Sequence, residues 1–265
     1  MPRLSHVLDS HWRMRQVFLS SSKVELQRRY AGSLLGPAWA VLYPVVFLSV
    51  YVFMWVVVLR VRLPDAGRLD YAVFVLAGLV PYLFFVESVS ASVLSIRQNL
   101  HLVKGVMLPV ELIPTRAVVV AGAGHLVGLA LVLLLSGWAH ALSARILLLP
   151  LVMALTTLGL FGLAWIVAPL GLLVPDATYL VNIVTTIFMF VTPIAFTVEM
   201  VPARFRAVIW LNPLTYMIQA YRSVLIDRAP IDLLAFGAFA AGALVIFLAG
   251  AALCARYKDV VVDFE

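Results

Sequence analysis

The fold is decided across residues 28–39, RRYAGSLLGPAW, where a basic lead gives way to the first long apolar run. Proline resists continuing a helix from behind it, so Gly36 and Pro37 predict a break at which the chain turns from one helix into the next. Gly32 contributes to this break, although an ordinary loop ahead of an apolar span also fits these residues. A second stretch, NPLTYMIQAYR at residues 212–222, interrupts the apolar sequence near its end. The two stretches bracket a chain otherwise built of lipid-soluble runs.

The composition is that of a membrane protein. The 265 residues are 64% hydrophobic and 12% charged, with a mean hydropathy of +1.06, whereas soluble domains are about half apolar and about a quarter charged. Apolar runs of about 20 residues, the length that crosses a bilayer as a helix, fill most of the chain. We therefore predict an all-α integral membrane protein with a single transmembrane domain over residues 1–265.

Six spans are predicted, and their even number places both termini on one side of the membrane. Lys and Arg are more numerous on that side than on the other, which indicates the cytoplasm. The long polar lead does not resemble a cleaved signal peptide. The predicted spans cover residues 38–60, 71–96, 114–138, 146–173, 178–197 and 232–254.

The lead, residues 10–30, carries apolar side chains at helical spacing among basic ones. This pattern predicts an amphipathic helix that lies in the membrane surface. The cations expected to contact lipid headgroups are Arg13, Arg15, Lys23, Arg28 and Arg29.

Two further segments interrupt the spans. Residues 97–108 repeat apolar side chains three or four positions apart, which predicts a short cytosolic amphipathic helix, although a solvated loop also fits. Residues 199–227 are cut into two short pieces by prolines and carry aromatics suited to a membrane interface. Two re-entrant helices satisfy this pattern, with a structured external loop as the alternative. The residues expected to form this external gate are Asn212, Pro213, Tyr216 and Tyr221.

The ionisable side chains placed clearly inside the predicted spans are Glu87 and His125. Glu87 suits a polar path or a coupling ion, but we expect a carboxyl in a wet cavity or one satisfied by neighbouring serines. Because His125 lies beside Gly124 and Gly128, whose spacing permits close helix approach, we expect a packed, hydrogen-bonded histidine rather than a proton relay. Two isolated groups are a thin basis for acid–base chemistry.

Several kinds of chemistry require sequence motifs that this sequence lacks. The sequence contains no G-x-x-x-x-G-K-[ST] phosphate loop, so coupling to ATP and Mg²⁺ requires a partner subunit. No metal or other cofactor is expected in this chain, since it lacks H-E-x-x-H and its single cysteine, Cys254, cannot form a cysteine metal cluster or an internal disulfide. The pI near 9.7 reflects orientation and contact with anionic lipids, so no nucleic-acid partner is expected.

Aromatic side chains in three spans offer broad apolar faces on which sugar rings stack. They suit a channel lining, although lipid-facing or packed aromatics show the same pattern. The candidates are Tyr51, Phe53 and Trp55 in the first span, Phe84 and Phe85 in the second, and Phe188 and Phe190 in the fifth.

Several motifs resemble those of type-2 ABC exporter permeases that move bacterial surface polysaccharides. They are RYAGSLLGPAW (29–39) with Tyr43-Pro44, AGLVPYLFF (77–85), LVKGVMLP (102–109), VTPIAF (191–196) and NPL (212–214). The resemblance therefore covers essentially the whole chain. The closing YKDVVVDFE (257–265) is similar to the O-antigen branch more than to the capsule branch.

The resemblance implies a homodimer of six-span subunits in the bacterial inner membrane, joined by two copies of an ABC ATPase that binds ATP and Mg²⁺. It implies export of a lipid-linked, O-antigen-like polysaccharide from cytosol to periplasm through a channel at the dimer interface. The sugar chain would contact the aromatics of the first and fifth spans, and the basic lead would meet the lipid phosphate. The resemblance also makes residues 97–108 a coupling helix, with force carried by Arg97, Leu100, Val103, Lys104 and Met107.

Other functions remain open. A permease for capsular polysaccharide or teichoic acid would share the same architecture, as would a type-2 ABC permease for small lipids or drugs. An ion-coupled transporter or an intramembrane enzyme would carry denser ionisable residues in its spans and would not copurify with an ATPase.

Overall fold

The computed structural model describes residues 11–61, 67–99, 109–226 and 232–262, with side chains in the last range up to Tyr257. Within these ranges the regular elements are helices, apart from an isolated bridge between Leu142 and Ile226. Among the described residues, five helices are long and apolar enough to cross a membrane. The predicted all-α membrane class is confirmed.

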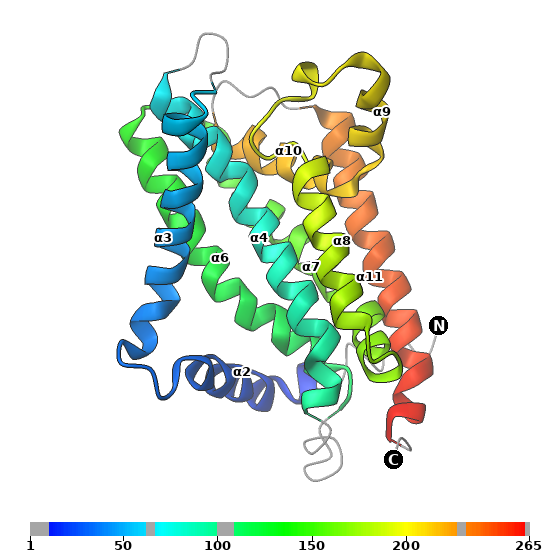
Figure 1. Ribbon diagram of the computed structural model, residues 1–265. Coiled ribbons are helices and arrows are strands. Elements are labelled where there is room, and N and C mark those ends of the chain that lie inside the picture. The colour runs from blue at the N-terminus through cyan, green and yellow to red at the C-terminus, as the bar shows by residue number, and fades with distance from the viewer. Residues whose placement is uncertain (1–10, 62–66, 100–108, 227–231, 263–265) are drawn as a thin grey trace.

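The five long helical segments lie close to five of the predicted spans; they are Gly36–Val58, Arg68–Gln98, Leu112–Trp138, Ala144–Leu173 and Leu233–Tyr257. The α-helices of the described ranges, labelled in Figure 1, are α2 (Arg15–Tyr30), α3 (Trp39–Phe53), α4 (Arg68–Gln98), α6 (Leu112–Trp138), α7 (Leu149–Leu173), α8 (Ala177–Val191), α9 (Ala203–Leu211), α10 (Pro213–Leu225) and α11 (Leu233–Val262). Short 3₁₀ or π turns extend or precede some of them, at Gly36–Ala38, Met54–Val58, Ala144–Leu148 and Val198–Met200.

The centre of the bundle is α4, which packs against α6 and α7, while α11 packs on the outer side of α7. Because α4 carries buried apolar residues all round its circumference, it suits a position surrounded by other helices. In Figure 1, α3 and α8 stand on either side of α4 on the face toward the viewer. The helix α3 is largely uncovered by the rest of the subunit.

The two ends of the bundle differ in what caps them. At the α2 end, one apolar cluster joins the beginning of the described chain to the ends of several helices, through Met14, Ile96, Leu112, Leu172 and Tyr257. At the opposite end, called here the α10 end, α10 packs against α4 and α11, and α9 lies beside α10 at the edge of the molecule (Figure 1). The start of the described chain and the end of α11 therefore lie at the same end of the bundle.

The break predicted between lead and first span is present. Gly32 and Gly36 have φ values of +81° and +50°, in the left-handed region that side chains with a Cβ rarely adopt. Pro37 then occupies the first turn of the 3₁₀ segment that leads into α3. Figure 1 shows the result, because α2 crosses the end of the bundle whereas α3 runs along it.

The fifth predicted span, residues 178–197, is longer than the helix that forms. The helix α8 ends at Val191, and Thr192 is extended, with φ −85° and ψ 134°. Proline disfavours the helical conformation of the residue before it, so Pro193 accounts for this end. At 15 residues, α8 is about 22 Å long, shorter than the roughly 30 Å hydrocarbon core of a bilayer.

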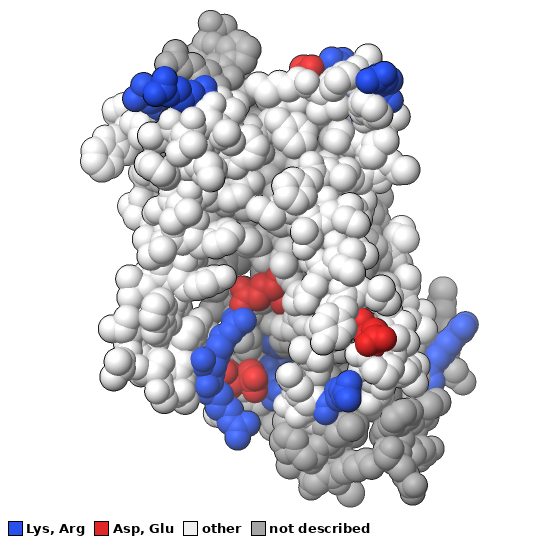
Figure 2. Space-filling model, viewed as in Figure 1, with Lys and Arg blue, Asp and Glu red and all other residues white. Residues whose placement is uncertain are grey.

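Helices approach most closely where glycine removes a side chain. A Cβ placed on Gly128 of α6 would come within 2.9 Å of Val80 on α4, which confirms the predicted close packing at this residue. Gly162 of α7 and Gly250 of α11 face each other in the same way, and neither has room for a Cβ. Figure 2 shows that charged side chains gather toward the two ends and leave an uncharged band between them, as membrane insertion requires.

Candidate functional site

A groove opens between α3, α4 and α6 toward the α2 end, with a volume of about 550 Å³. We call it the α3 groove. Figure 2 shows this face hollowed, with acidic and basic atoms meeting in the hollow. Its wall is mainly apolar and aromatic and includes Tyr43, Phe47 and Phe84, while Arg29 and Glu87 supply charge. It joins an apolar surface to an ionic one.

One wall of the groove belongs to a row of aromatic rings on α3 and the turn that follows. The ring centroids of Tyr43 and Phe47 lie 6.2 Å apart, those of Phe47 and Tyr51 6.5 Å, and those of Tyr51 and Trp55 6.1 Å. Residues four apart lie on the same face of a helix, so the four rings form one ladder. The sequence-based candidates included Tyr51 and Trp55 but missed Tyr43 and Phe47, which the four-residue spacing alone would have found. Phe53 lies off this ladder and is 57% exposed.

The remaining predicted aromatics fall in different surroundings. Phe84 is buried and stacks on His125 at a centroid distance of 4.5 Å. Phe85 is also buried and meets Phe188 of α8 edge to face at 6.4 Å. Phe190 points outward and is exposed. Of these rings, Phe84 lines the α3 groove together with Tyr43 and Phe47, whereas Phe85, Phe188 and Phe190 do not. A place in a channel lining stays a prediction for all of them.

His125 is packed and hydrogen-bonded, as expected. Its Nε2 lies 3.0 Å from the hydroxyl oxygen of Tyr221, and the two rings meet edge to face. Tyr221 is completely buried, so the expectation that it is an interfacial aromatic is wrong. Its hydroxyl finds a partner inside the protein instead of at a wet surface. The contact ties α10 to α6 in the core.

Glu87 lies inside α4 and lines the α3 groove, which agrees with the expected wet cavity. Its carboxylate pairs with Arg29 of α2, so the alternative of partners among neighbouring serines does not apply. The side chains of Arg29 and Glu87 keep 42% and 31% of their surface exposed. The pair joins the lead to the middle of the bundle in contact with solvent.

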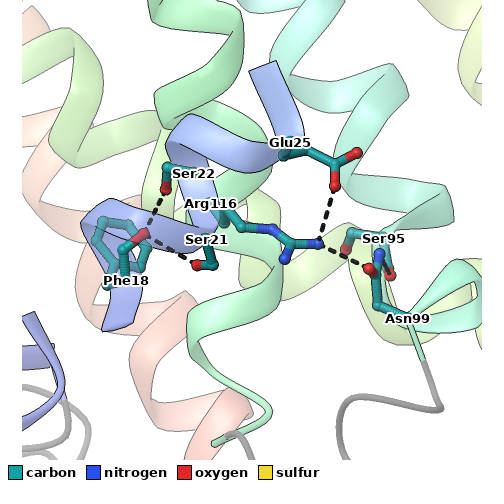
Figure 3. A network of polar contacts seen from close by, with 7 residues as sticks. All are labelled: Phe18, Ser21, Ser22, Glu25, Ser95, Asn99 and Arg116. Atoms are coloured by element: carbon teal, nitrogen blue, oxygen red, sulfur yellow. Dashed lines mark hydrogen bonds and ion pairs between the residues drawn. The ribbon is translucent and has the colours of Figure 1, made fainter. Parts of the chain in front are cut away.

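A second ionic group lies close by and is drawn in Figure 3. Arg116 donates to Asn99 Oδ1 at 2.7 Å and lies 3.6 Å from Glu25 Oε2. Asn99 in turn donates to the carbonyl of Ser95, which holds it at the end of α4. Arg116 is buried in α6, which begins at Leu112, just ahead of the predicted span. Pro114 lies in the first turn of α6, where proline is tolerated.

These charges surround a small cavity of about 260 Å³, which we call the basic cavity. Three guanidinium side chains line it, from Arg28, Arg29 and Arg116, together with the carboxylates of Glu25 and Glu87. Arg29 and Glu87 line the α3 groove as well. The ion pair between them therefore forms the wall between the two spaces.

Other predicted residues at the α2 end are exposed. Arg13, Arg15, Lys23 and Arg97 all reach the surface, and the Arg15 guanidinium stacks 4.6 Å from the ring centroid of Trp12. Contact between these cations and lipid stays a prediction. Four of the predicted coupling residues lie outside the described residues: Leu100, Val103, Lys104 and Met107.

At the α10 end, Asn212 joins three elements. Its Oδ1 accepts from the Leu214 N–H at 3.0 Å and so caps α10, while its Nδ2 donates to Thr192 Oγ1 at 2.7 Å. Pro213 fills the first position of the helix, where its missing N–H costs nothing. Tyr216 is half-buried, with its ring 5.7 Å from that of Trp210 on α9. The segment after α8 is thus tied to α9 and α10.

Arg222 of α10 is a buried cation that the sequence analysis does not single out. It is buried and donates to the carbonyl oxygens of Phe74 at 3.3 Å and Ile194 at 2.5 Å. Its guanidinium carbon also lies 3.5 Å from the ring centroid of Phe74. Gly78 makes room for it, because a Cβ there would meet Arg222 Nη2 at 2.9 Å. Arg222 belongs to residues 199–227, which are predicted to form an external gate, and local sequence gives no sign that it is buried.

Residues 16–226 match the model of the family described as ABC-2 type transporter. The chain belongs to this family. As an ABC-2 type transporter with five long apolar helices, it is a multi-pass membrane protein, and members of this family are transporter permease subunits. The chain is 29% identical over 206 residues to the O-antigen export system permease protein RfbA of Klebsiella pneumoniae, which covers 77% of each chain. It is 27% identical over 247 residues to the protein of the same name from Myxococcus xanthus, covering 91% of this chain and 92% of the relative.

Proposed function

We propose that this chain is the membrane subunit of an ATP-driven exporter that moves a lipid-linked, O-antigen-like polysaccharide from cytosol to periplasm. The observation that carries the proposal is the family match over residues 16–226 together with similarity along most of the chain to permeases named for O-antigen export. The relatives favour O-antigen over capsule, teichoic acid or small lipids as cargo.

The proposed channel lies between two copies of the chain. Exposed apolar side chains cover α3 and α8, and these helices flank α4 on one face of the subunit (Figure 1). Two such faces brought together enclose a path bordered by the ladder of Tyr43, Phe47, Tyr51 and Trp55. Aromatic faces support sugar rings by apolar contact without fixing one orientation, which suits a sliding polymer.

The proposed membrane placement puts the α2 end and both termini in the cytosol of a bacterium, with α2 in the surface of the inner membrane. Six crossings follow when α8 counts as the fifth. Because α8 alone is too short to cross, α9 and α10 complete its depth from the periplasmic side as re-entrant helices.

Energy is proposed to come from two copies of a separate ABC ATPase, which bind ATP and Mg²⁺. Residues 97–108 are proposed to sit in a cleft of that partner and to transmit its movement as a rigid body. Exchanging this segment for a flexible linker of equal length should leave ATP hydrolysis but abolish export. Undiminished export would contradict the coupling role.

The function is tested by deleting the gene from its own bacterium and restoring it on a plasmid. Loss of surface polysaccharide, with lipid-linked glycan accumulating on the cytosolic leaflet, is the expected result. Surface labelling combined with extraction of glycolipid separates the outcomes: loss of capsule or teichoic acid alone would assign a different cargo. Unchanged surface glycans of all three kinds would overturn the proposal.

A further inference from the structure

The α3 groove and the basic cavity share one wall, the ion pair between Arg29 and Glu87. We propose that the basic cavity binds the phosphate or diphosphate ester of a polyprenyl-linked ligand. In the absence of ligand Glu87 pairs with Arg29, and the ligand's anion takes the place of the Glu87 carboxylate. This inference rests on the proposed function, since a lipid-linked substrate supplies such an ester.

The cavity has the charge that an anion requires. Arg28 and Arg29 reach it from α2, and Arg116 reaches it from α6. Three guanidinium groups face two carboxylates, so the lining keeps a positive excess. Guanidinium groups match phosphate oxygens with paired hydrogen bonds, and an anion between them also relieves their mutual repulsion.

The contacts distinguish Arg116, which is held in place, from Arg29, whose ion pair can exchange. Arg116 is held by Asn99 at 2.7 Å and its side chain is only 6% exposed. Arg29 is 42% exposed and its partner Glu87 is 31% exposed. Ion pairs open to water contribute little to stability, so an incoming anion exchanges with Glu87 at small cost. Arg116 provides the preorganised part of the site.

The groove on the other side of the pair suits the rest of the ligand. Tyr43, Phe47 and Phe84 give it an apolar wall, and its volume is about 550 Å³. When Arg29 leaves Glu87, the groove and the basic cavity become continuous. A phosphate ester with an apolar chain then fills both, whereas inorganic phosphate fills only the cavity and an uncharged prenol only the groove.

Asn99 gives this site a route to the rest of the transporter. It accepts the hydrogen bond from Arg116 and lies within residues 97–108, the segment proposed to meet the ATPase. An anion bound to Arg116 is therefore one hydrogen bond away from that segment.

The experiment measures the Kd of radiolabelled farnesyl diphosphate for the complete permease–ATPase complex in lipid nanodiscs, with radiolabelled farnesol as the uncharged control. Glu87→Gln removes the internal anion and should lower the Kd for farnesyl diphosphate about fivefold. Arg29→Gln should raise it at least tenfold, and the double variant should bind as weakly as Arg29→Gln. Arg204→Gln, which removes an exposed cation of α9 far from both spaces, should leave it unchanged.

Each alternative gives a different pattern. If the pair only holds α2 in place, both single variants weaken binding equally, and that outcome overturns the proposal. It is also overturned if farnesol responds to Glu87→Gln as strongly as farnesyl diphosphate does. Competition by inorganic diphosphate at equal affinity would assign the site to a free anion and contradict a lipid-linked ligand. Because gene deletion tests export separately, the site can fail while the proposed function stands.

Discussion

At the α2 end, ion pairs link separate helices, and three of the four side chains in the pairs Arg29–Glu87 and Arg116–Glu25 are exposed to water. At the α10 end, the guanidinium of Arg222 is buried and donates to backbone carbonyls of α4 and of the turn after α8. A guanidinium stays charged in proteins, so its burial requires partners that remain in place. The difference indicates an exchangeable joint at one end and a permanent one at the other.

Removing Arg222 should have the largest effect on this comparison. Arg222→Ala removes the donor to the carbonyl of Ile194, which lies outside any helix, and the second bond to the carbonyl of Phe74 together with the stacking on its ring. We expect a loss of about 3 kcal/mol in the free energy of unfolding. The loss can be measured by denaturant titration of the purified protein in detergent. Arg206→Ala is the matched control, because Arg206 also donates to two carbonyls, those of Val201 and Glu199, but is only half-buried. Equal losses in the two variants would remove burial as the reason.

Asn212 is the next strongest test of a permanent joint. Asn212→Ala removes the cap of α10 and the donor to Thr192, so the free energy of unfolding should fall by about 2 kcal/mol. Thr192→Val removes only the second contact and should cost about half as much. A double-mutant cycle by denaturant titration separates the two contributions. Identical losses from both single variants would mean that the cap contributes nothing.

The contact between Tyr221 and His125 should carry a smaller energy. Tyr221→Phe deletes one hydroxyl and leaves His125 Nε2 unpaired, at a cost of about 1 kcal/mol in the free energy of unfolding. Tyr216→Phe on the same helix is the control, since the packing of its ring on Trp210 is retained. Thermal unfolding of the two variants side by side gives the comparison. A larger loss for Tyr216→Phe would mean that the hydroxyl of Tyr216 makes the stronger polar contact, which contradicts the prediction for Tyr221.

Glu87→Gln should have the smallest effect on stability. Because the pair with Arg29 is open to solvent, the free energy of unfolding should change by less than about 1 kcal/mol, and the change should shrink further at high salt. Denaturant titration at two salt concentrations measures both. A loss as large as that of Arg222→Ala would show that the α2 end is as permanently joined as the α10 end.

Much of the architecture follows from local sequence. Hydropathy alone located five membrane-length helices, since a run of about 20 apolar residues has few other stable conformations in lipid. The turn at Gly36 and Pro37 and the helix start at Asn212 and Pro213 follow equally from residue type, because positive φ and a missing N–H restrict the backbone directly. Pro193 predicts the early end of α8, whereas the apolar composition of residues 178–197 predicted a longer span.

The candidate site was less predictable, because it depends on contacts between residues distant in the chain. The ladder on α3 is a local feature, and its spacing was present in the sequence. The partners of Glu87, Arg116, Tyr221 and Arg222 are 58, 17, 96 and up to 148 residues away. No periodicity reports such pairings. Tyr221 was therefore expected at a membrane interface, although it is buried in the core.

By itself the sequence determined that the protein lies in a membrane, where its helices form and where they break, because hydropathy and backbone restriction act within a few residues. Only the tertiary structure decided which charges are buried, which are paired and which two spaces one ion pair separates. Those outcomes depend on how α2, α4, α6 and α10 pack, and burial changes the free energy of a charge far more than its sequence neighbours do.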